Sequence, residues 1–155
     1  MFETFFLQTI FNSPIFILKH ELIKMPVFGW YLKKIGSVSV NRNKISKDNL
    51  GLIDKIKKSV KMSNRPLIIF PQGTRVLPSE FIPFKKGVGR IYDELKIKCQ
   101  PVAVNSGKVW PKSGQLIPKK TITISILPPV KPGMKAVEFT SFIEKEIYNE
   151  LGLIN

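Results

Sequence analysis

The apolar residues of this chain fall into short runs, separated by longer stretches in which they recur at helical spacing. Runs rich in Val, Ile, Phe or Thr and bounded by Gly, Pro, Asn or Ser are typical of β-strands. Five such runs cover residues 14–18, 37–40, 66–70, 101–104 and 121–127. Residues 121–126 alternate strictly between polar and apolar, which predicts a strand nearer the sheet edge than the continuously apolar residues 67–70.

Three further stretches predict helices. The first starts at Ser46, a suitable N-cap residue, and repeats apolar residues every three or four positions. The second begins near Gly87, and the third begins with the capping box of residues 141–144 and ends at Gly152. Strands that alternate with helices predict an α/β fold, with a mostly parallel central sheet flanked by helices. No internal repeat or long linker is present in the sequence, so residues 1–155 are predicted to form a single domain.

The composition supports a folded domain with a strongly basic surface. Of the 155 residues, 43% are hydrophobic, which is enough to build a core. Lys and Arg number 25 against 11 Asp and Glu, which gives a net charge of +14. Such a surface attracts nucleic acid, an anionic bilayer or a phosphorylated small molecule, and charge alone does not choose among them.

The single cysteine, Cys99, excludes an internal disulfide and a cysteine-rich metal site. It precedes the apolar residues 101–104, so we expect an inert, partly buried thiol in a reducing compartment. We expect no metal and no cofactor.

Two predicted strands end in an arginine. Residues 70–75, FPQGTR, follow the apolar strand, and residues 36–42, GSVSVNR, contain the earlier one. Ligands of parallel α/β sheets gather at the carboxyl ends of the strands. If the two strands are neighbours, Arg42 and Arg75 could surround one phosphate, a geometry that guanidinium groups suit well. Taken singly, each arginine is more often a solvated surface residue than a ligand, and Gly73 and Gly87 could equally be ordinary turn glycines.

Three blocks in this order resemble the lysophosphatidic acid acyltransferase family, the bacterial 1-acyl-sn-glycerol-3-phosphate acyltransferases. Residues 36–42 are similar to its second block, a Gly and a β run followed by an acidic or amide residue and Arg. FPQGTR resembles its third block, FPEGTR, and residues 100–104, QPVAV, resemble its fourth. Residues 84–87, FKKG, match a companion segment of the family. The likeness extends over about residues 1–130 and implies a glycerolipid acyltransferase-like fold.

The resemblance also implies roles for individual residues. Arg42 and Arg75, with Gly73, Thr74 and Lys85, would hold the phosphate of lysophosphatidic acid. In the fourth block, Pro101 and Val102 would shape the acyl or acceptor pocket. Gln72 stands where the family usually has Glu, which removes a negative charge near the phosphate and leaves in doubt any role of that carboxylate.

This sequence differs most from the family in the first block, which carries the catalytic residues. The family uses His as general base, in a His-x-x-x-x-Asp arrangement that orients the imidazole. His20 is the only histidine, and Met25 stands five residues later, so we interpret His20 as a surface or structural residue. Glu3 matches the acidic position, so the resemblance implies that Glu3 would be the catalytic carboxylate. We therefore expect a chain truncated at its N-terminus, with the catalytic His and a membrane-associating segment upstream, and inactive or impaired as written.

By this resemblance the protein is an enzyme of phospholipid biosynthesis. It would move an acyl group from acyl-CoA or acyl carrier protein, as co-substrate, to lysophosphatidic acid and give phosphatidic acid. Its partners would be lysophospholipid, the acyl donor and an anionic membrane surface, at the cytoplasmic face of the bacterial inner membrane. In this form we expect peripheral attachment, because the apolar residues near the N-terminus are interrupted well short of the ~20 that a spanning helix needs.

Two alternatives stay open. A basic domain that binds nucleic acid or the ribosome would account for the charge and for the lysine-rich stretch of residues 46–62. However, the aromatic residues cluster in apolar segments and are not interleaved with Lys and Arg as stacking platforms would be, so we predict no nucleic acid partner. A noncatalytic lipid-binding remnant would differ from the acyltransferase only in lacking turnover.

Overall fold

A computed structural model describes residues 2–40, 47–77, 80–111 and 113–154. The chain divides into two compact units, Met1–Phe70 and Pro71–Asn155. The boundary falls inside the FPQGTR block. Each unit is described by itself.

The first unit contains a parallel sheet of three strands. These are β1 (Ile15–Lys19), β2 (Val38–Val40) and β3 (Leu67–Ile69), in the order β2-β1-β3. Ile17 is opposite Val38, and Ile15 is opposite Leu67. The predicted strands at residues 14–18, 37–40 and 66–70 are therefore confirmed. β1 supplies the core, as expected of the middle strand of a parallel sheet, since Ile15, Phe16 and Leu18 are all buried.

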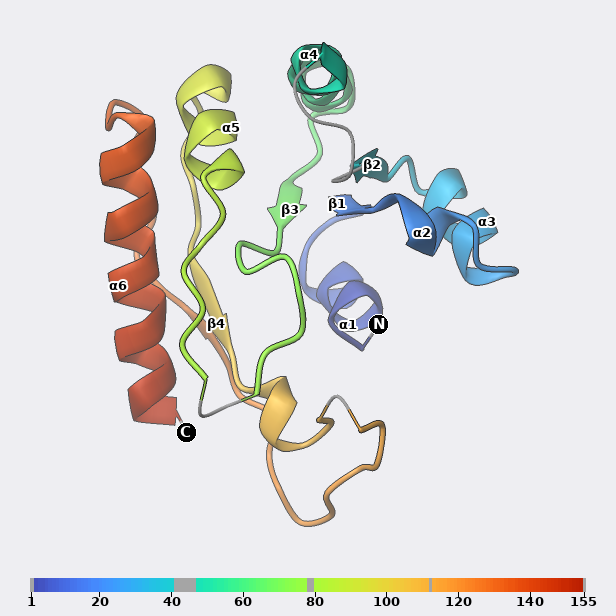
Figure 1. Ribbon diagram of the computed structural model, residues 1–155, viewed down its shortest axis with the longest axis vertical. Coiled ribbons are helices and arrows are strands. Elements are labelled where there is room, and N and C mark those ends of the chain that lie inside the picture. The colour runs from blue at the N-terminus through green and yellow to red at the C-terminus, as the bar shows by residue number, and fades with distance from the viewer. Residues whose placement is uncertain (1, 41–46, 78–79, 112, 155) are drawn as a thin grey trace. The chain divides into compact units, whose positions relative to one another are not determined.

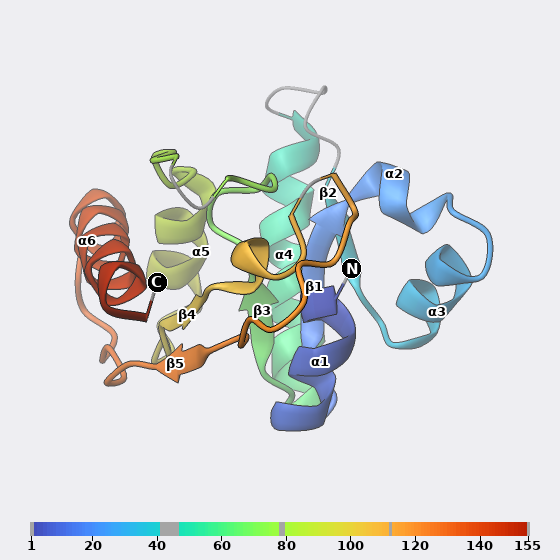
Figure 2. The same cartoon turned by 90° about the horizontal axis from the view of Figure 1, so that it is seen from below.

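Helices cover both faces of this sheet. α1 (Phe2–Ile10) and α4 (Lys47–Ser63) lie on opposite sides of it (Figures 1 and 2). The predicted lysine-rich helix is α4, which turns Ile56 fully into the core; its expected N-cap, Ser46, lies outside the described residues. Two short helices, α2 (His20–Ile23) and α3 (Phe28–Lys34), connect β1 to β2. The sequence patterns did not predict α1, α2 or α3.

Arg65 joins the starts of all three strands. It stands just before β3, and its guanidinium donates hydrogen bonds to three backbone carbonyls from the segments that lead into β1 and β2. Nε donates to Ser13, and Nη2 donates to Pro14 at 3.3 Å and to Ile35 at 2.7 Å. A planar fork with several fixed N–H directions suits such a task better than the point charge of lysine.

The second unit combines an antiparallel pair of strands with two helices. β4 (Val102–Val104) pairs with β5 (Ile124–Ile126), and Val102 is opposite Ile126. β5 pairs with no other described strand, and residues 121–123 are not part of it. The prediction that residues 121–126 lie nearer a sheet edge than residues 67–70 is wrong, because β3 is itself the edge strand in the order β2-β1-β3. A short 3-10 helix, η1 (Ser106–Lys108), follows β4. The fold is α/β with a parallel sheet flanked by helices, as predicted, and β4 and β5 form a separate antiparallel element.

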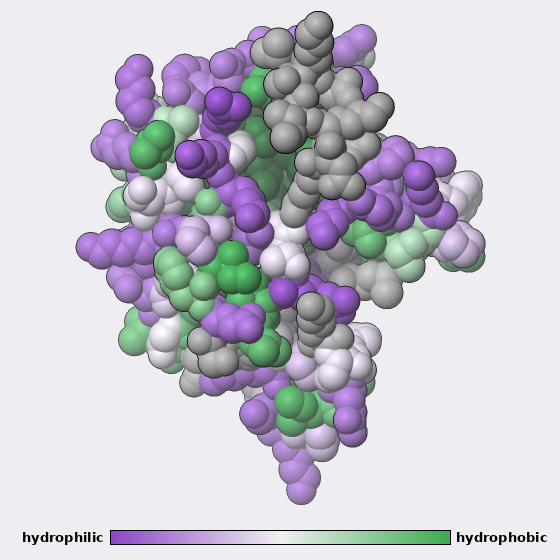
Figure 3. Space-filling model, in the orientation of Figure 1, coloured by the Kyte–Doolittle hydropathy of each residue, from purple (hydrophilic) through white to green (hydrophobic). Residues whose placement is uncertain are grey.

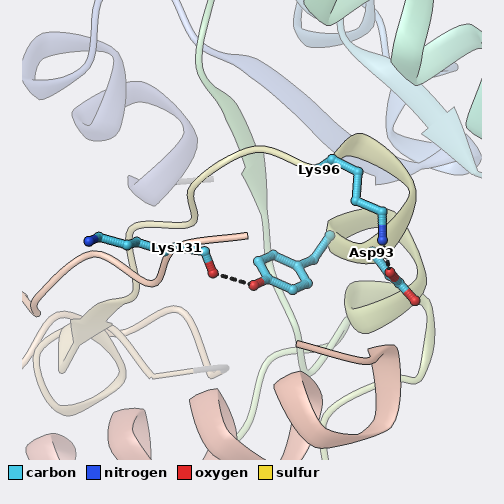
Figure 4. A network of polar contacts seen from close by, with 4 residues as sticks. Asp93, Lys96 and Lys131 are labelled. Carbon is cyan, nitrogen blue, oxygen red and sulfur yellow. Dashed lines mark hydrogen bonds and ion pairs between the residues drawn. The ribbon is translucent and has the colours of Figure 1, made fainter. Parts of the chain in front are cut away.

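The helices α5 (Gly87–Leu95) and α6 (Ala136–Ile154) pack against each other. Tyr92 stacks on Phe139 with ring centroids 3.6 Å apart and planes inclined by 3°, and the Tyr92 hydroxyl donates to the Lys131 carbonyl (Figure 4). Gly89 lies so close to α6 that a Cβ on it would be 2.8 Å from the Ala136 carbonyl carbon and nearer still to its oxygen. Glycine is therefore required at this crossing.

The predicted start of the last helix at the capping box is wrong. α6 begins five residues earlier, at Ala136, and ends at Ile154 instead of Gly152. Its buried residues are Phe139, Ile143 and Ile147, one turn apart from each other. Burial of Phe139 against α5 extends the helix upstream of Ser141, which lies exposed in its interior.

Among the helices that the structure describes, none combines the length and the apolar character needed to cross a bilayer.

Candidate functional site

The FPQGTR block forms a turn at the start of the second unit. Gly73 has φ +68°, a left-handed conformation that glycine adopts without strain, so its prediction as a turn glycine is confirmed. Gln72 and Gly73 are half-buried, whereas Thr74 and Arg75 are exposed. The turn thus presents a hydroxyl and a guanidinium to solvent.

The second cationic segment lies directly beside this turn. The backbone N–H of Lys85 donates to the Pro71 carbonyl at 3.0 Å. Phe84 fixes this segment from the other side, because its ring is buried near Tyr148 and its N–H donates to the Glu144 carboxylate. The side chain of Lys85 is exposed. The structure therefore brings together two segments that lie ten or more residues apart in the sequence.

Gly87, the other glycine of this region, is not a turn glycine. It is the first residue of α5 and has no positive φ, and a Cβ on it would meet nothing within 4 Å. Its alternative interpretation as an ordinary turn residue is wrong.

The strand that precedes Arg42 does not neighbour the strand that precedes FPQGTR. β1 lies between β2 and β3, so the expectation of two adjacent strand ends is wrong. Because all three strands are parallel, β2 and β3 still end at the same edge of the sheet, about 10 Å apart across β1. Asn41 and Arg42 lie outside the described residues.

The proposed catalytic carboxylate lies on α1. Glu3 is half-buried in the first turn of this helix, where the macrodipole favours a negative charge. His20 is exposed at the start of α2, and its Nδ1 is 3.2 Å from the Ser39 hydroxyl oxygen. The interpretation of His20 as a surface residue is confirmed. The catalytic role of Glu3 stays a prediction.

The fourth block belongs to the β4–β5 ladder. The buried Pro101 accepts a hydrogen bond from the Leu127 N–H at 3.0 Å, and Val102 pairs with Ile126. The sequence patterns missed the cleft that lies further along β4, where Val104 and Asn105 form part of the wall. Pro101 and Val102 do not line this cleft, and their role in a substrate pocket stays a prediction.

The cleft of the second unit has a volume of about 260 Å³. Its walls are about equally polar and apolar and come from the segment around and after FPQGTR, the end of β4 and the last turns of α6. The main apolar residues are Val76, Leu77, Phe81, Val104, Tyr148 and Leu151. Gln72 and Glu80 add polar groups. Asn105 is engaged within the protein, since its amide donates to the Ile154 carbonyl and accepts from the Thr123 N–H.

Metal-ligand geometry and pKa shifts add no further catalytic group among the described residues. In the part of the chain that the structure describes, no group of three or more His, Cys, Asp or Glu residues could hold a metal ion. Burial raises the pKa of the Cys99 thiol to about 11, which confirms the prediction of an inert, partly buried cysteine. The ion pair with Lys96 at the end of α5 lowers the pKa of Asp93 (Figure 4).

Comparison with known proteins identifies the class. The family model described as Acyltransferase matches residues 2–105, about two thirds of the sequence. This range contains all three blocks and the FKKG segment. The chain belongs to this acyltransferase family.

Its individual relatives carry a more specific name. The 1-acyl-sn-glycerol-3-phosphate acyltransferase of Pseudomonas aeruginosa is 31% identical over 128 residues, 81% of this chain and 49% of that protein. The enzyme of the same name from Helicobacter pylori is 35% identical over 115 residues, 71% of this chain and 47% of that protein. The chain thus spans about half the length of these relatives.

A solved structure shares the fold. The 1-acyl-sn-glycerophosphate (LPA) acyltransferase PlsC from Thermotoga maritima matches with a TM-score of 0.65 and 22% identity. The match covers 90% of this chain and 56% of that one.

Proposed function

We propose that the chain carries the acceptor-binding part of a 1-acylglycerol-3-phosphate O-acyltransferase. The reaction moves a fatty acyl group from acyl-CoA or acyl carrier protein to lysophosphatidic acid. The hydroxyl oxygen attacks the thioester carbonyl, a C–O bond forms as the C–S bond breaks, and the proton passes through a base to the leaving thiol. The products are phosphatidic acid and the free thiol.

The main structural support for this proposal is the hydrogen bond between the Lys85 N–H and the Pro71 carbonyl. It holds the FKKG segment against the FPQGTR turn, so that the exposed Lys85 and Arg75 belong to adjoining loops. Cationic side chains and a hydroxyl on adjoining loops suit a phosphate monoester, which offers several acceptor oxygens and a double charge.

The proposed roles follow from this arrangement. Arg75, Thr74 and Lys85 bind the acceptor phosphate, and the backbone of Gly73 lets the turn approach it closely. Arg42 contributes to the same phosphate, and Pro101 and Val102 shape the acyl or acceptor pocket; for these three residues the support is the family resemblance. Glu3 orients the general base.

We assign no general base within this chain. His20, its single histidine, is exposed and within hydrogen-bond distance of Ser39. A missing base typically lowers the rate by ~10²–10⁴, while binding of the acceptor is retained. We therefore propose that this chain binds lysophosphatidic acid at the cytoplasmic face of a bacterial inner membrane, as a peripheral protein, and turns it over slowly.

The test measures binding and turnover separately. Titration calorimetry with lysophosphatidic acid below its micelle concentration should show binding, and monoacylglycerol, which lacks the phosphate, should not bind. Arg75→Ala and Lys85→Ala should each weaken binding by about 10- to 100-fold, since each removes a charge-assisted contact. Lys98→Ala, which removes an exposed charge from the same unit, is the matched control.

Equal affinity in Arg75→Ala and Lys98→Ala would refute the proposed phosphate site. Tighter binding of a single-stranded RNA oligomer, weakened by the same substitutions, would favour the nucleic-acid alternative. Turnover is followed as release of free thiol from acyl-CoA in the presence of lysophosphatidic acid.

A further inference from the structure

The connection between α2 and α3 exposes apolar side chains at the surface of the first unit. Val27 is 82% exposed and Trp30 is 65% exposed, and Met25 is also exposed. Val27 has φ 60° and ψ −60°, which is costly for a β-branched residue, by about 1–3 kcal/mol. Core packing does not explain a valine here, because its side chain is almost fully exposed to solvent. Glycine would suit the backbone better.

Lysines surround these apolar residues. Lys24 is the C-cap residue of α2, and Lys33 and Lys34 form the last turn of α3. The ammonium of Lys34 lies 5.0 Å from the centroid of the Trp30 ring. We call Lys24, Met25, Val27, Trp30 and Lys34 the α2–α3 tip. Figure 3 shows hydrophobic and hydrophilic residues side by side over α2 and α3.

A cavity adjoins this tip. It has a volume of about 580 Å³, and Trp30, Lys34, Arg65 and Gln8 are among the residues that line it. The side-chain amide nitrogen of Gln8 is buried and has no hydrogen-bond acceptor among the residues that the structure describes. A buried donor without a partner is unfavourable. Lys34 and Arg65 on the wall of this cavity favour an anionic group there.

A lipid surface is the partner that accounts for the exposed apolar residues, the lysines and the cavity together. Trp prefers the boundary between headgroups and acyl chains, where its ring is in an apolar environment and its N–H stays wet. Lysines beside it reach back to anionic headgroups while their stems stay in apolar surroundings. A nucleic acid would leave Met25 and Val27 exposed to water.

We propose that the α2–α3 tip docks this chain on a bilayer of anionic phospholipids. Val27 and Trp30 enter the boundary between headgroups and acyl chains, and the cavity beside Trp30 takes one headgroup phosphate. This deepens the proposed function, on which it rests for a substrate presented by a membrane. The residues of the docking surface belong to the first unit, whereas the Lys85–Pro71 contact belongs to the second.

The experiment uses sedimentation of the full chain with vesicles that contain no lysophosphatidic acid. Vesicles of phosphatidylcholine with about 30% phosphatidylglycerol should bind the chain, and pure phosphatidylcholine should bind it at least tenfold more weakly because the lysines lose their attraction. Val27→Ser and Trp30→Ser should each weaken binding by about tenfold or more, because each removes buried apolar surface. Val137→Ser is the matched control, since Val137 is 78% exposed in the second unit.

A second variant separates docking from folding. Val27→Gly should weaken vesicle binding like Val27→Ser and yet keep an equal or higher thermal midpoint, because glycine tolerates positive φ. In a Trp110→Phe background, Trp30 fluorescence should shift to the blue on binding. Unchanged binding of Val27→Gly and Trp30→Ser, or equal binding to both kinds of vesicle, would overturn the proposal. Arg75→Ala should bind vesicles normally, so failure of the phosphate site and failure of the tip are distinguishable.

Discussion

Arg65 donates hydrogen bonds to three backbone carbonyls, so its replacement should strongly lower the stability of the first unit. A hydrogen bond from a charged donor contributes about 1.5–3 kcal/mol. In Arg65→Ala, water can replace the bond to the exposed Ser13, whereas the bonds to the buried Pro14 and the half-buried Ile35 are lost. Two bonds at the low end of the range give a loss of about 3 kcal/mol. For a unit of this size, the thermal midpoint falls by about 12–24 °C.

Fluorescence of Trp30 during thermal and urea unfolding isolates this unit, provided that Trp110, which belongs to the other unit, is replaced by Phe. Arg65→Lys should lose more than half as much as Arg65→Ala, since an ammonium keeps the charge but cannot reach three carbonyls with a fixed fork. Lys61→Ala, an exposed substitution in the last turn of α4, should change stability by less than about 0.5 kcal/mol. The reasoning fails if Arg65→Ala matches this control or if Arg65→Lys matches the parent.

Three further predictions concern the second unit. Gly89→Ala should lose about 1–3 kcal/mol in urea unfolding, because its Cβ collides with Ala136; Gly87→Ala, with open space around it, should gain up to about 1 kcal/mol, and equal values would rule out the close crossing. Gly73→Ala should lose about 1–2 kcal/mol, because alanine is strained at φ +68°, and a neutral result would contradict that conformation. Iodoacetamide at pH 8 should modify native Cys99 about a hundredfold more slowly than in the urea-unfolded chain, because burial raises its pKa from 9.0 to about 11. The raised pKa means that this thiol contributes stability below pH 9, which is lost between about pH 9 and 11, and equal modification rates would show an accessible thiol.

Short, strongly biased segments were predictable from sequence. β1, β2, β3 and β4 follow β-branched runs bounded by turn residues, and α4 follows a clear helical repeat. The sequence also indicated the turn at FPQGTR, because its glycine is needed for the left-handed conformation that Gly73 adopts.

Other elements depend on contacts that no local pattern displays. α1 is rich in Phe and Thr, which are mediocre helix formers, and its helix is stabilised by burial of Leu7 and Thr4. The strand order β2-β1-β3 was equally invisible, since sequence order does not determine which strands pair. The same holds for the cleft wall from Tyr148 and Leu151, which lie more than 60 residues after Gln72 and approach it only in the folded unit.

Arg65 also affects how long the folded first unit lasts. The carbonyls that it binds lie 52, 51 and 30 residues away along the chain. Contacts so distant in sequence form only after the intervening loops have closed, and we predict that these bonds form after the transition state. An interaction absent from the transition state changes the unfolding rate and leaves the folding rate almost unaffected. Arg65 is therefore expected to slow unfolding and so to lengthen the lifetime of the native sheet.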